Sequence, residues 1–279
     1  MDFVSLVNDN LTGKESKKKE VPYDRSSHWP TSASIKKFDG SILGSCNLAL
    51  YRKWKNVPET NPVTSDSLQK FAWGNLFHSW VTDILSEEHL SGKLKSVENE
   101  VPFKIALPNL KYPISGRIDA VINGNIGLEI KSSFGAFFFG KDSGLITCGP
   151  KPEYILQALC YLKARPDLEY FVMLFLARDI GFKLQYKIER KGDSVLVKHY
   201  DIKEKKEKTK EYPEISFGGI VSRWMALEKC LEKNEEPAPD WVRHKSSYPC
   251  SWCNYMTMCY PDKKATAILP KYDKGQGEG

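Results

Sequence analysis

The sequence predicts an α/β fold, because segments with helical periodicity alternate with segments whose apolar residues recur at every second position. A long helical pattern covers residues 66–92, and period-two patterns follow it between residues 96 and 132. A second helical pattern begins at Pro152 and leads into the apolar run of residues 170–177. We therefore expect a mixed central sheet flanked by helices.

The composition is that of an ordinary folded protein. The chain has 279 residues, 41% hydrophobic and 27% charged, and its 41 Lys and Arg against 35 Asp and Glu give a formal net charge of +6. At roughly 100–200 residues per domain, this length allows one large domain or two modest ones. The apolar run of residues 171–177 is far shorter than the roughly 18 residues of a membrane span, and the N-terminus has no secretory pattern. We expect a cytoplasmic protein without a membrane partner.

The N-terminal third combines a polar arm with helical patterns. Residues 1–30 are polar and mixed in charge, which predicts a loose arm. Residues 32–38 predict a short capped helix, and an apolar and basic stretch covers residues 46–54. In the long helical pattern, Asp66 and Gln69 form an expected capping pair. The apolar residues of that pattern recur at helical spacing: Phe77, Trp80, Val81, Ile84 and Leu85.

The period-two segments predict strands over residues 97–107, 112–122 and 126–132, and Asn123-Gly124-Asn125 is a strong hairpin signal between the last two. A three-residue turn places Asp119 directly opposite Glu129. In this register the apolar residues of both strands share one face: Ile118, Ala120, Ile122, Leu128 and Ile130. Burial of that face favours the register that pairs the two carboxylates.

After the hairpin, the sequence predicts two helices and three strands. The expected elements are a helix from Pro152, strands over residues 170–177, 182–188 and 195–200, and a helix over residues 217–231. The charged run of residues 203–211 predicts a solvated loop. Pro237 and Pro239 are expected to end the last helix.

Two carboxylates that face each other repel, which destabilises a sheet unless something compensates. A divalent cation would compensate, and Mg²⁺ and Mn²⁺ prefer hard oxygen ligands while keeping positions for water and phosphate. Lys131 lies on the same face as Asp119 and Glu129, so its side chain would orient or deprotonate an attacking water. The alternative is an exposed salt bridge of either carboxylate with Lys131.

The cysteines indicate a second metal site. Three of the seven form the cluster Cys250-x2-Cys253-x5-Cys259, which in a reducing compartment is more typical of a metal site than of a disulfide. Zinc sites and iron-sulfur clusters usually need four ligands, so a fourth must come from elsewhere. For zinc, Cys46 or His244 would serve.

Together these motifs resemble the PD-(D/E)XK nuclease superfamily, and in particular its RecB-like branch. The resemblance rests on Asp119-x9-Glu129-x-Lys131, on His78 in the upstream helix, and on Gln157-x3-Tyr161 in the following helix. It covers roughly residues 32–262 and implies a restriction-endonuclease-like fold, a mixed central sheet flanked by helices.

The resemblance also implies roles for individual residues. The Mg²⁺ or Mn²⁺ ligands would be His78, Asp119, Glu129 and the main-chain carbonyl of Ile130. The catalytic residues would be Lys131, Asp119 and Glu129. Gln157 and Tyr161 would line the DNA channel. Glu100 is a further acidic contributor, or else an ordinary surface residue.

The RecB-like nucleases that carry an iron-sulfur cluster, namely the AddB-type and CRISPR-adaptation exonucleases, place one cysteine before the nuclease core and three after it. The resemblance therefore implies a 4Fe-4S cluster on Cys46, Cys250, Cys253 and Cys259, with Zn²⁺ as the alternative. The implied domain spans residues 31–262. Its core covers about residues 66–200, its cluster-binding subdomain combines residues 31–60 with 215–262, and residues 263–279 form a tail.

We accordingly expect a metal-dependent DNA exonuclease that acts on single-stranded DNA ends, from 5′ to 3′ by resemblance. Bases are expected to stack on Trp73, Trp80 and Tyr161. One alternative is a catalytically silent DNA-binding module that works with helicase, recombination or integration proteins. Another is a nuclease that acts on RNA.

Overall fold

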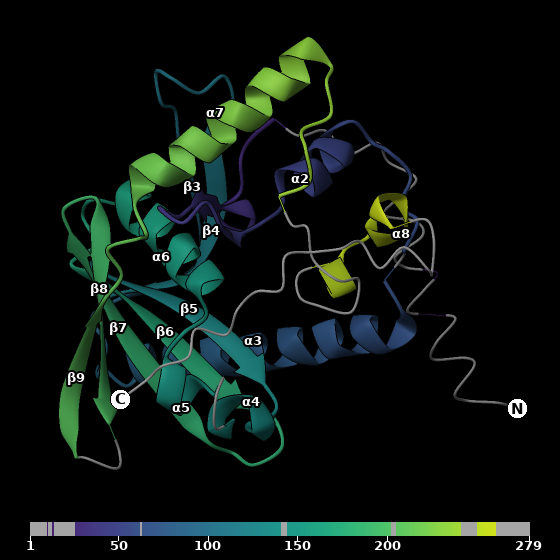
Figure 1. Cartoon of the computed structure of the whole chain (residues 1–279). Helices are drawn as coiled ribbons and strands as arrows, with labels where there is room; N and C mark the ends of the chain where they lie inside the picture. Colours follow the sequence, from purple (N-terminus) through teal and green to yellow (C-terminus); the bar gives the residue numbers. More distant parts are fainter. Residues whose placement is uncertain are drawn as a thin grey trace, which may run out of the picture.

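A mixed sheet forms the centre of the protein (Figure 1). The computed structural model describes residues 26–61, 63–140, 144–201, 205–240 and 250–260, together with residues 10 and 13. Within this part of the chain, seven strands form the sheet in the order β3-β4-β5-β6-β7-β8-β9. They are β3 (Val97–Ile105), β4 (Ile114–Ile122), β5 (Ile126–Ser133), β6 (Tyr170–Ala177), β7 (Lys183–Lys191), β8 (Ser194–Asp201) and β9 (Lys206–Glu211). Only β5 and β6 pair in parallel among these neighbours, so the expected mixed α/β sheet is confirmed.

Helices cover both faces of the sheet (Figure 1). On one face lies α3 (Ser65–Leu90), whose Val81 packs against the sheet in an apolar cluster with Ala120, Leu128 and Ile130. On the other face, α6 (Pro152–Ala164) and α7 (Phe217–Lys233) pack into a larger cluster. Because the middle strands are buried on both sides, polar side chains near the sheet centre need specific partners. None of the helices in the described residues is long and apolar enough to cross a membrane.

The β4–β5 hairpin has the predicted register. Ala120 pairs with Leu128 and Ile122 with Ile126, across a three-residue turn in which Asn123 and Gly124 have positive φ. The pairing stops one position before Asp119 and Glu129, whereas β5 pairs with β6 along its whole length.

The expected single apolar face of β4 is wrong at Asp119. Ile118 and Val121 both pack in the cluster of α6 and α7, whereas Ala120 and Ile122 pack beneath α3. The strand therefore changes face at Asp119. The neighbouring strand β3 is irregular at the same level, since Glu100 has a φ of 54° there. This local twist lets Asp119 lie between the two layers of helices.

The N-terminal segment differs most from expectation. Instead of a helix over residues 32–38, a short 3-10 turn, η1 (Pro30–Ser32), leads into β1 (Ser34–Lys36), which pairs with β2 (Ile42–Gly44). Residues 26–30 are not a loose arm, because Ser27 and His28 are buried. The rest of the expected arm, apart from residues 10 and 13, and the tail of residues 263–279 lie outside the described residues.

Three other local expectations are corrected. The N-cap of α3 is Thr64, whose hydroxyl accepts the N–H of Ser67, so the pair of Asp66 and Gln69 does not cap the helix. The charged run forms β9, an exposed edge strand on β8 whose charges suit an edge. Helix α7 ends before the prolines, at Asn234 in the left-handed conformation. The short helices α4 (Gly135–Phe139) and α5 (Leu145–Cys148) were not expected.

Residues from both ends of the chain meet beside α7. Helix α2 (Asn47–Trp54) packs Leu50 and Tyr51 against Leu227 of α7. The short η2 (Cys250–Trp252) and α8 (Met256–Cys259) lie next to α2 (Figure 1). The N–H groups of Thr60 and Asn61 donate to the carbonyl of Asn254, at 3.0 and 2.9 Å.

A buried carboxylate on α7 holds the N-terminal segment in place. Glu228 pairs with His28 Nε2 at 2.8 Å and accepts the N–H groups of Lys111 and Tyr112 at 2.9 and 3.0 Å. The His28 ring stacks on Trp224, with centroids 5.0 Å apart. Three groups distant in the sequence thus depend on one side chain.

Replacing Glu228 with Ala leaves His28 and two partly buried N–H groups without this acceptor, so we expect a loss of about 3 kcal/mol in the free energy of unfolding. Urea denaturation measures this loss. The matched control is Glu232→Ala, one turn further along α7, where an exposed carboxylate faces Lys111 at 3.5 Å. The control should change the stability by less than about 0.5 kcal/mol. Equal effects of the two variants would contradict the role of Glu228.

Candidate functional site

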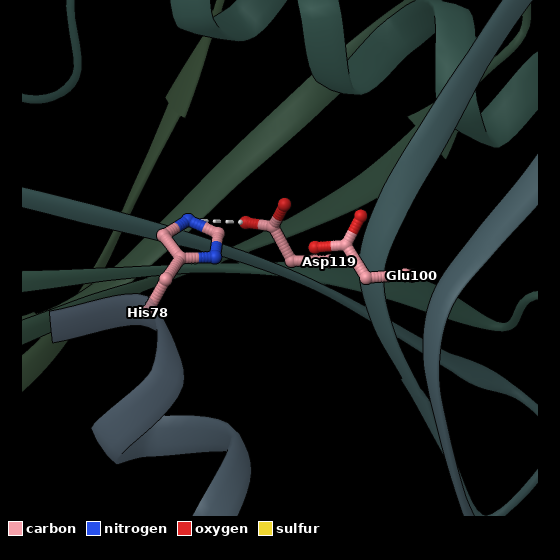
Figure 2. A group of neighbouring side chains, drawn as sticks. All are labelled: His78, Glu100 and Asp119. Carbon is pink, nitrogen blue, oxygen red and sulfur yellow. Dashed lines mark ion pairs between the residues drawn. The ribbon is translucent and has the colours of Figure 1, made fainter. Parts of the chain in front are cut away.

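Three side chains from three elements converge at the point where β4 changes face. His78 comes from α3, Glu100 from β3 and Asp119 from β4, and their ligand atoms all lie within 4.8 Å of one another (Figure 2). In the described part of the chain, this is the one such group of three or more His, Cys, Asp or Glu residues. Glu100, which the sequence left open as a surface residue, therefore belongs to the site. Its carboxylate also pairs with Arg117 at 2.9 Å.

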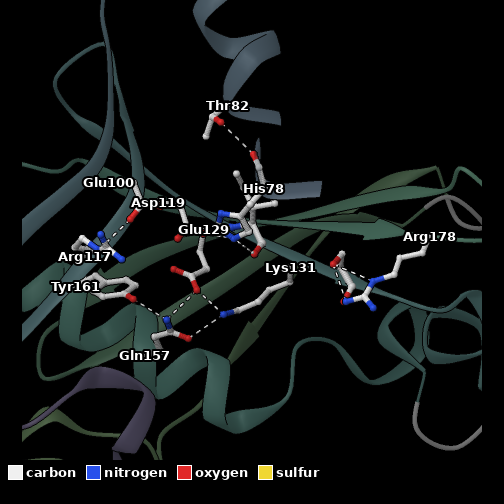
Figure 3. Close-up of polar contacts among 12 residues, drawn as sticks. His78, Thr82, Glu100, Arg117, Asp119, Glu129, Lys131, Gln157, Tyr161 and Arg178 are labelled. Carbon is white, nitrogen blue, oxygen red and sulfur yellow. Dashed lines mark hydrogen bonds and ion pairs between the residues drawn. The ribbon is translucent and has the colours of Figure 1, made fainter. Parts of the chain in front are cut away.

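A main-chain carbonyl completes the contacts around His78 (Figure 3). His78 Nε2 lies 3.1 Å from Asp119 Oδ2 and 3.0 Å from the carbonyl oxygen of Ile130. The N–H of Ile130 donates to Asp119 Oδ2 at 2.7 Å, which fixes the carboxylate against β5. The structure thus brings together three of the four expected metal-ligand groups at contact distance.

The fourth expected ligand, Glu129, is buried, with 4% of its surface exposed. Its Oε1 pairs with the ammonium of Lys131 and accepts the side-chain N–H of Gln157 at 2.8 Å. Its Oε2 is buried and has no hydrogen-bond partner in the described part of the chain. A buried carboxylate oxygen without a partner is costly, so this atom could accept a further partner.

The electrostatics follow from this burial. Burial raises the pKa of Glu129, and the charge of Asp119 raises it further against the opposing effect of Lys131. Burial alone would lower the pKa of Lys131, but the contact with Glu129 outweighs it and the pKa is raised. The hydrogen bond with Asp119 raises the pKa of His78. Lys131 is therefore an ammonium at neutral pH.

Gln157 and Tyr161 on α6 form a hydrogen-bond chain that ends at Glu129 (Figure 3). The amide of Gln157 accepts from Lys131 Nζ at 3.2 Å and donates to the hydroxyl of Tyr161 at 2.6 Å. Tyr161 is buried, with 3% of its surface exposed. Both residues border the cleft described next. Both are nevertheless buried, and the polar atoms of Gln157 are bonded to Glu129, Lys131 and Tyr161.

A cleft of ≈ 840 Å³ opens over the site, bordered by His78, Asp119 and Glu129. Its other polar and basic lining residues include Asn75, Ser79, Asn99, Lys104, Ser115 and Arg117. Trp73 and Trp80, which we expected to stack with bases, do not border this cleft. Trp29 does, and it is 46% exposed. The sequence offered no sign of this, because Trp29 falls within the segment that we took for a loose arm.

Arg178, just after β6, ties α3 to β5. Its guanidinium donates to the carbonyl and hydroxyl of Ser132, at 3.1 and 2.9 Å from Nη2, and to the carbonyl of Lys70 at 3.1 Å. Gly74 sits directly over this contact, since a Cβ there would lie 3.5 Å from Nη2 of Arg178. His78 follows one turn later on the same helix.

The four cysteines that the resemblance singled out border one pocket of ≈ 380 Å³. Cys46 is the N-cap of α2, and Cys250, Cys253 and Cys259 come from the C-terminal segment. Burial raises the pKa of the Cys253 thiol, and the other three thiols add to the shift. The guanidinium of Arg52 lies 3.4 Å from Cys259 Sγ. His244 lies outside the described residues.

No protein-family model matches the chain, and no curated protein matches it. Among solved structures, the chain is similar to one described as "Crystal structure of SSO0001", with a TM-score of 0.47 and 14% sequence identity. The match covers 92% of this chain and 95% of that chain.

Proposed function

We propose that the protein is a divalent-metal-dependent nuclease that hydrolyses phosphodiester bonds in DNA. The observation that carries this proposal is the buried, unpartnered Oε2 of Glu129 beside His78 and Asp119. A cation would satisfy that oxygen and relieve the repulsion between the two carboxylates.

His78 Nε2 lies 3.1 Å from Asp119 Oδ2 and 3.0 Å from the Ile130 carbonyl oxygen. The ligand atoms that lie within 4.8 Å of one another are those of His78, Glu100 and Asp119, and this group does not include Glu129. In the proposed site, His78, Asp119, Glu129 and the Ile130 carbonyl would hold Mg²⁺ or Mn²⁺, with Glu100 as a further acidic contributor. When bound, the ion would polarise the phosphate and lower the pKa of an attacking water.

Lys131 supplies a fixed positive charge next to this ligand set. We assign it to stabilising the negative charge that develops on the phosphate. Gln157 orients it, and the ring of Tyr154 lies 5.1 Å from Nζ.

The cleft and the charge of the chain support a nucleic-acid substrate. Lys104 and Arg117 border the cleft, and the net charge of +6 favours a polyanion. The preference for single-stranded DNA ends and the 5′ to 3′ direction are proposed on the resemblance alone.

We further propose that Cys46, Cys250, Cys253 and Cys259 hold a 4Fe-4S cluster. The four cysteines border one pocket, and the choice of a cluster over a single Zn²⁺ is proposed on the resemblance. The cluster would staple the two ends of the domain together.

The assignment of Lys131 predicts that Lys131→Ala lowers the cleavage rate roughly 100-fold or more. Binding of the same strand should persist. The assay uses protein purified without oxygen and strands labelled at either end, with Mg²⁺, Mn²⁺ or EDTA. The matched control is Lys183→Ala, on the exposed start of β7, which should cut at the wild-type rate.

Wild-type cleavage by Lys131→Ala would show that the active site is assigned wrongly. A wild-type protein that binds DNA but does not cut it with any metal would favour the silent binding module instead.

The metal site predicts a stability linkage. At 100 times its dissociation constant, a bound ion stabilises the native state by about 2.7 kcal/mol. Mn²⁺ should therefore raise the melting temperature of the wild type by roughly 5–10 °C. Asp119→Asn should lose most of this rise, because the amide is a weaker ligand. Asp66→Asn, an exposed change on α3, should keep it, and an equal rise in both variants would contradict the ligand set.

The cysteine site predicts that Cys253→Ser purifies without iron and melts at a lower temperature than the wild type. Elemental analysis and visible absorbance measure the metal content. Cys148→Ser changes an exposed cysteine on α5 and should retain the iron. Unchanged iron content in Cys253→Ser would contradict the cluster, and stoichiometric zinc in the wild type would replace it with the zinc alternative.

A further inference from the structure

An exposed tryptophan borders the cleft. Trp29 is 46% exposed and lines the cleft together with Asp119 and Glu129. Its indole makes no ring contact with another aromatic residue in the described part of the chain.

The backbone on both sides of Trp29 is fixed. His28 is buried and pairs with the start of β4, where its N–H donates to Pro113 at 2.8 Å and its carbonyl accepts from Ser115 at 2.9 Å. The carbonyl of Trp29 itself accepts the N–H and the hydroxyl of Ser32, at 2.8 and 2.7 Å. The exposed ring is therefore held on a rigid support.

A glycine in β4 makes room for this support. A Cβ on Gly116 would lie 3.2 Å from the ring of Pro30 and 3.0 Å from the ring of Phe103. Gly116 thus lets the Trp29–Pro30 turn lie flat against β4, three residues before Asp119. Strand β4 thus carries Asp119 and lies against the turn that carries Trp29, and both residues line the same cleft.

We propose that Trp29 is a stacking platform for a nucleobase of the strand that occupies the cleft. Base–aromatic stacking tolerates any sequence, and Lys104 and Arg117 in the same cleft can contact the phosphates. The bases of a duplex are already stacked on each other, so this contact is available only to an unpaired strand. The inference rests on the proposed nuclease function and makes Trp29 a determinant of single-strand preference.

The test measures binding of labelled single-stranded and duplex DNA to the full chain in EDTA, so that no strand is cut. Trp29→Ala should weaken single-strand binding by at least about fivefold and leave duplex binding within about twofold. Trp29→Phe should recover much of the loss. The matched control is Trp80→Ala, which removes an equally exposed indole (46%) that lies outside the cleft, and it should bind as the wild type does.

A second arm separates stacking from a structural role. A single abasic nucleotide is moved along the strand, and binding to wild type and Trp29→Ala is compared at each position. At one position the missing base should weaken wild-type binding as much as Trp29→Ala does, and Trp29→Ala should be insensitive to it there. A variant that was merely misfolded would lose binding yet keep the wild-type sensitivity to the abasic site.

The outcomes distinguish the two proposals. If the wild type binds and cuts single strands while Trp29→Ala binds them equally well, the stacking platform is wrong and the nuclease stands. The same holds if every abasic position affects both proteins alike. If the wild type neither binds nor cuts single-stranded DNA, both proposals fall.

Discussion

The carboxylate of Glu129 is buried beside Asp119, and one of its oxygens has no partner in the described residues. Much of the surrounding structure compensates for this charge. Lys131 and Gln157 satisfy the other oxygen, and the main-chain N–H of Ile130 holds Asp119 at 2.7 Å. We propose that a divalent cation satisfies the remaining oxygen. We expect the negative charges of Glu129 and Asp119 to be fully compensated only when a divalent ion is bound.

The fold brings the parts of this site together from both faces of the sheet. Helix α3 delivers His78 from one face, where Arg178 ties it to β5, and α6 supports Glu129 from the other. Helix α7 links the site to the cysteine pocket. Its Leu227 packs against α2, which Cys46 begins, and its Glu228 anchors His28 next to Trp29. Loss of a cluster at the cysteines should thus loosen the cleft wall as well as the chain ends.

The sequence was sufficient for the parts of the site that depend on local patterns. The Asn-Gly turn and the period-two apolar residues predicted the hairpin register, and therefore the proximity of Asp119 to Glu129. The sequence was not sufficient for the parts of the structure that depend on contacts between residues far apart in the chain. Trp29 is ordered because His28 reaches a carboxylate 200 residues away, and no local pattern reports that contact. Strict alternation failed at Asp119 because the strand twists between two helical layers, and β9 forms because β8 offers it an edge.

The central claim is that His78, Asp119, Glu129 and the Ile130 carbonyl surround one divalent cation. The most direct test is diffraction from crystals grown with Mn²⁺, with data collected at the manganese absorption edge. We predict a single strong anomalous peak bonded to His78 Nε2, to both carboxylates through atoms that include Glu129 Oε2, and to the Ile130 carbonyl. A map with manganese elsewhere, or with His78 still hydrogen-bonded to Ile130 and no ion beside Glu129, would contradict the account.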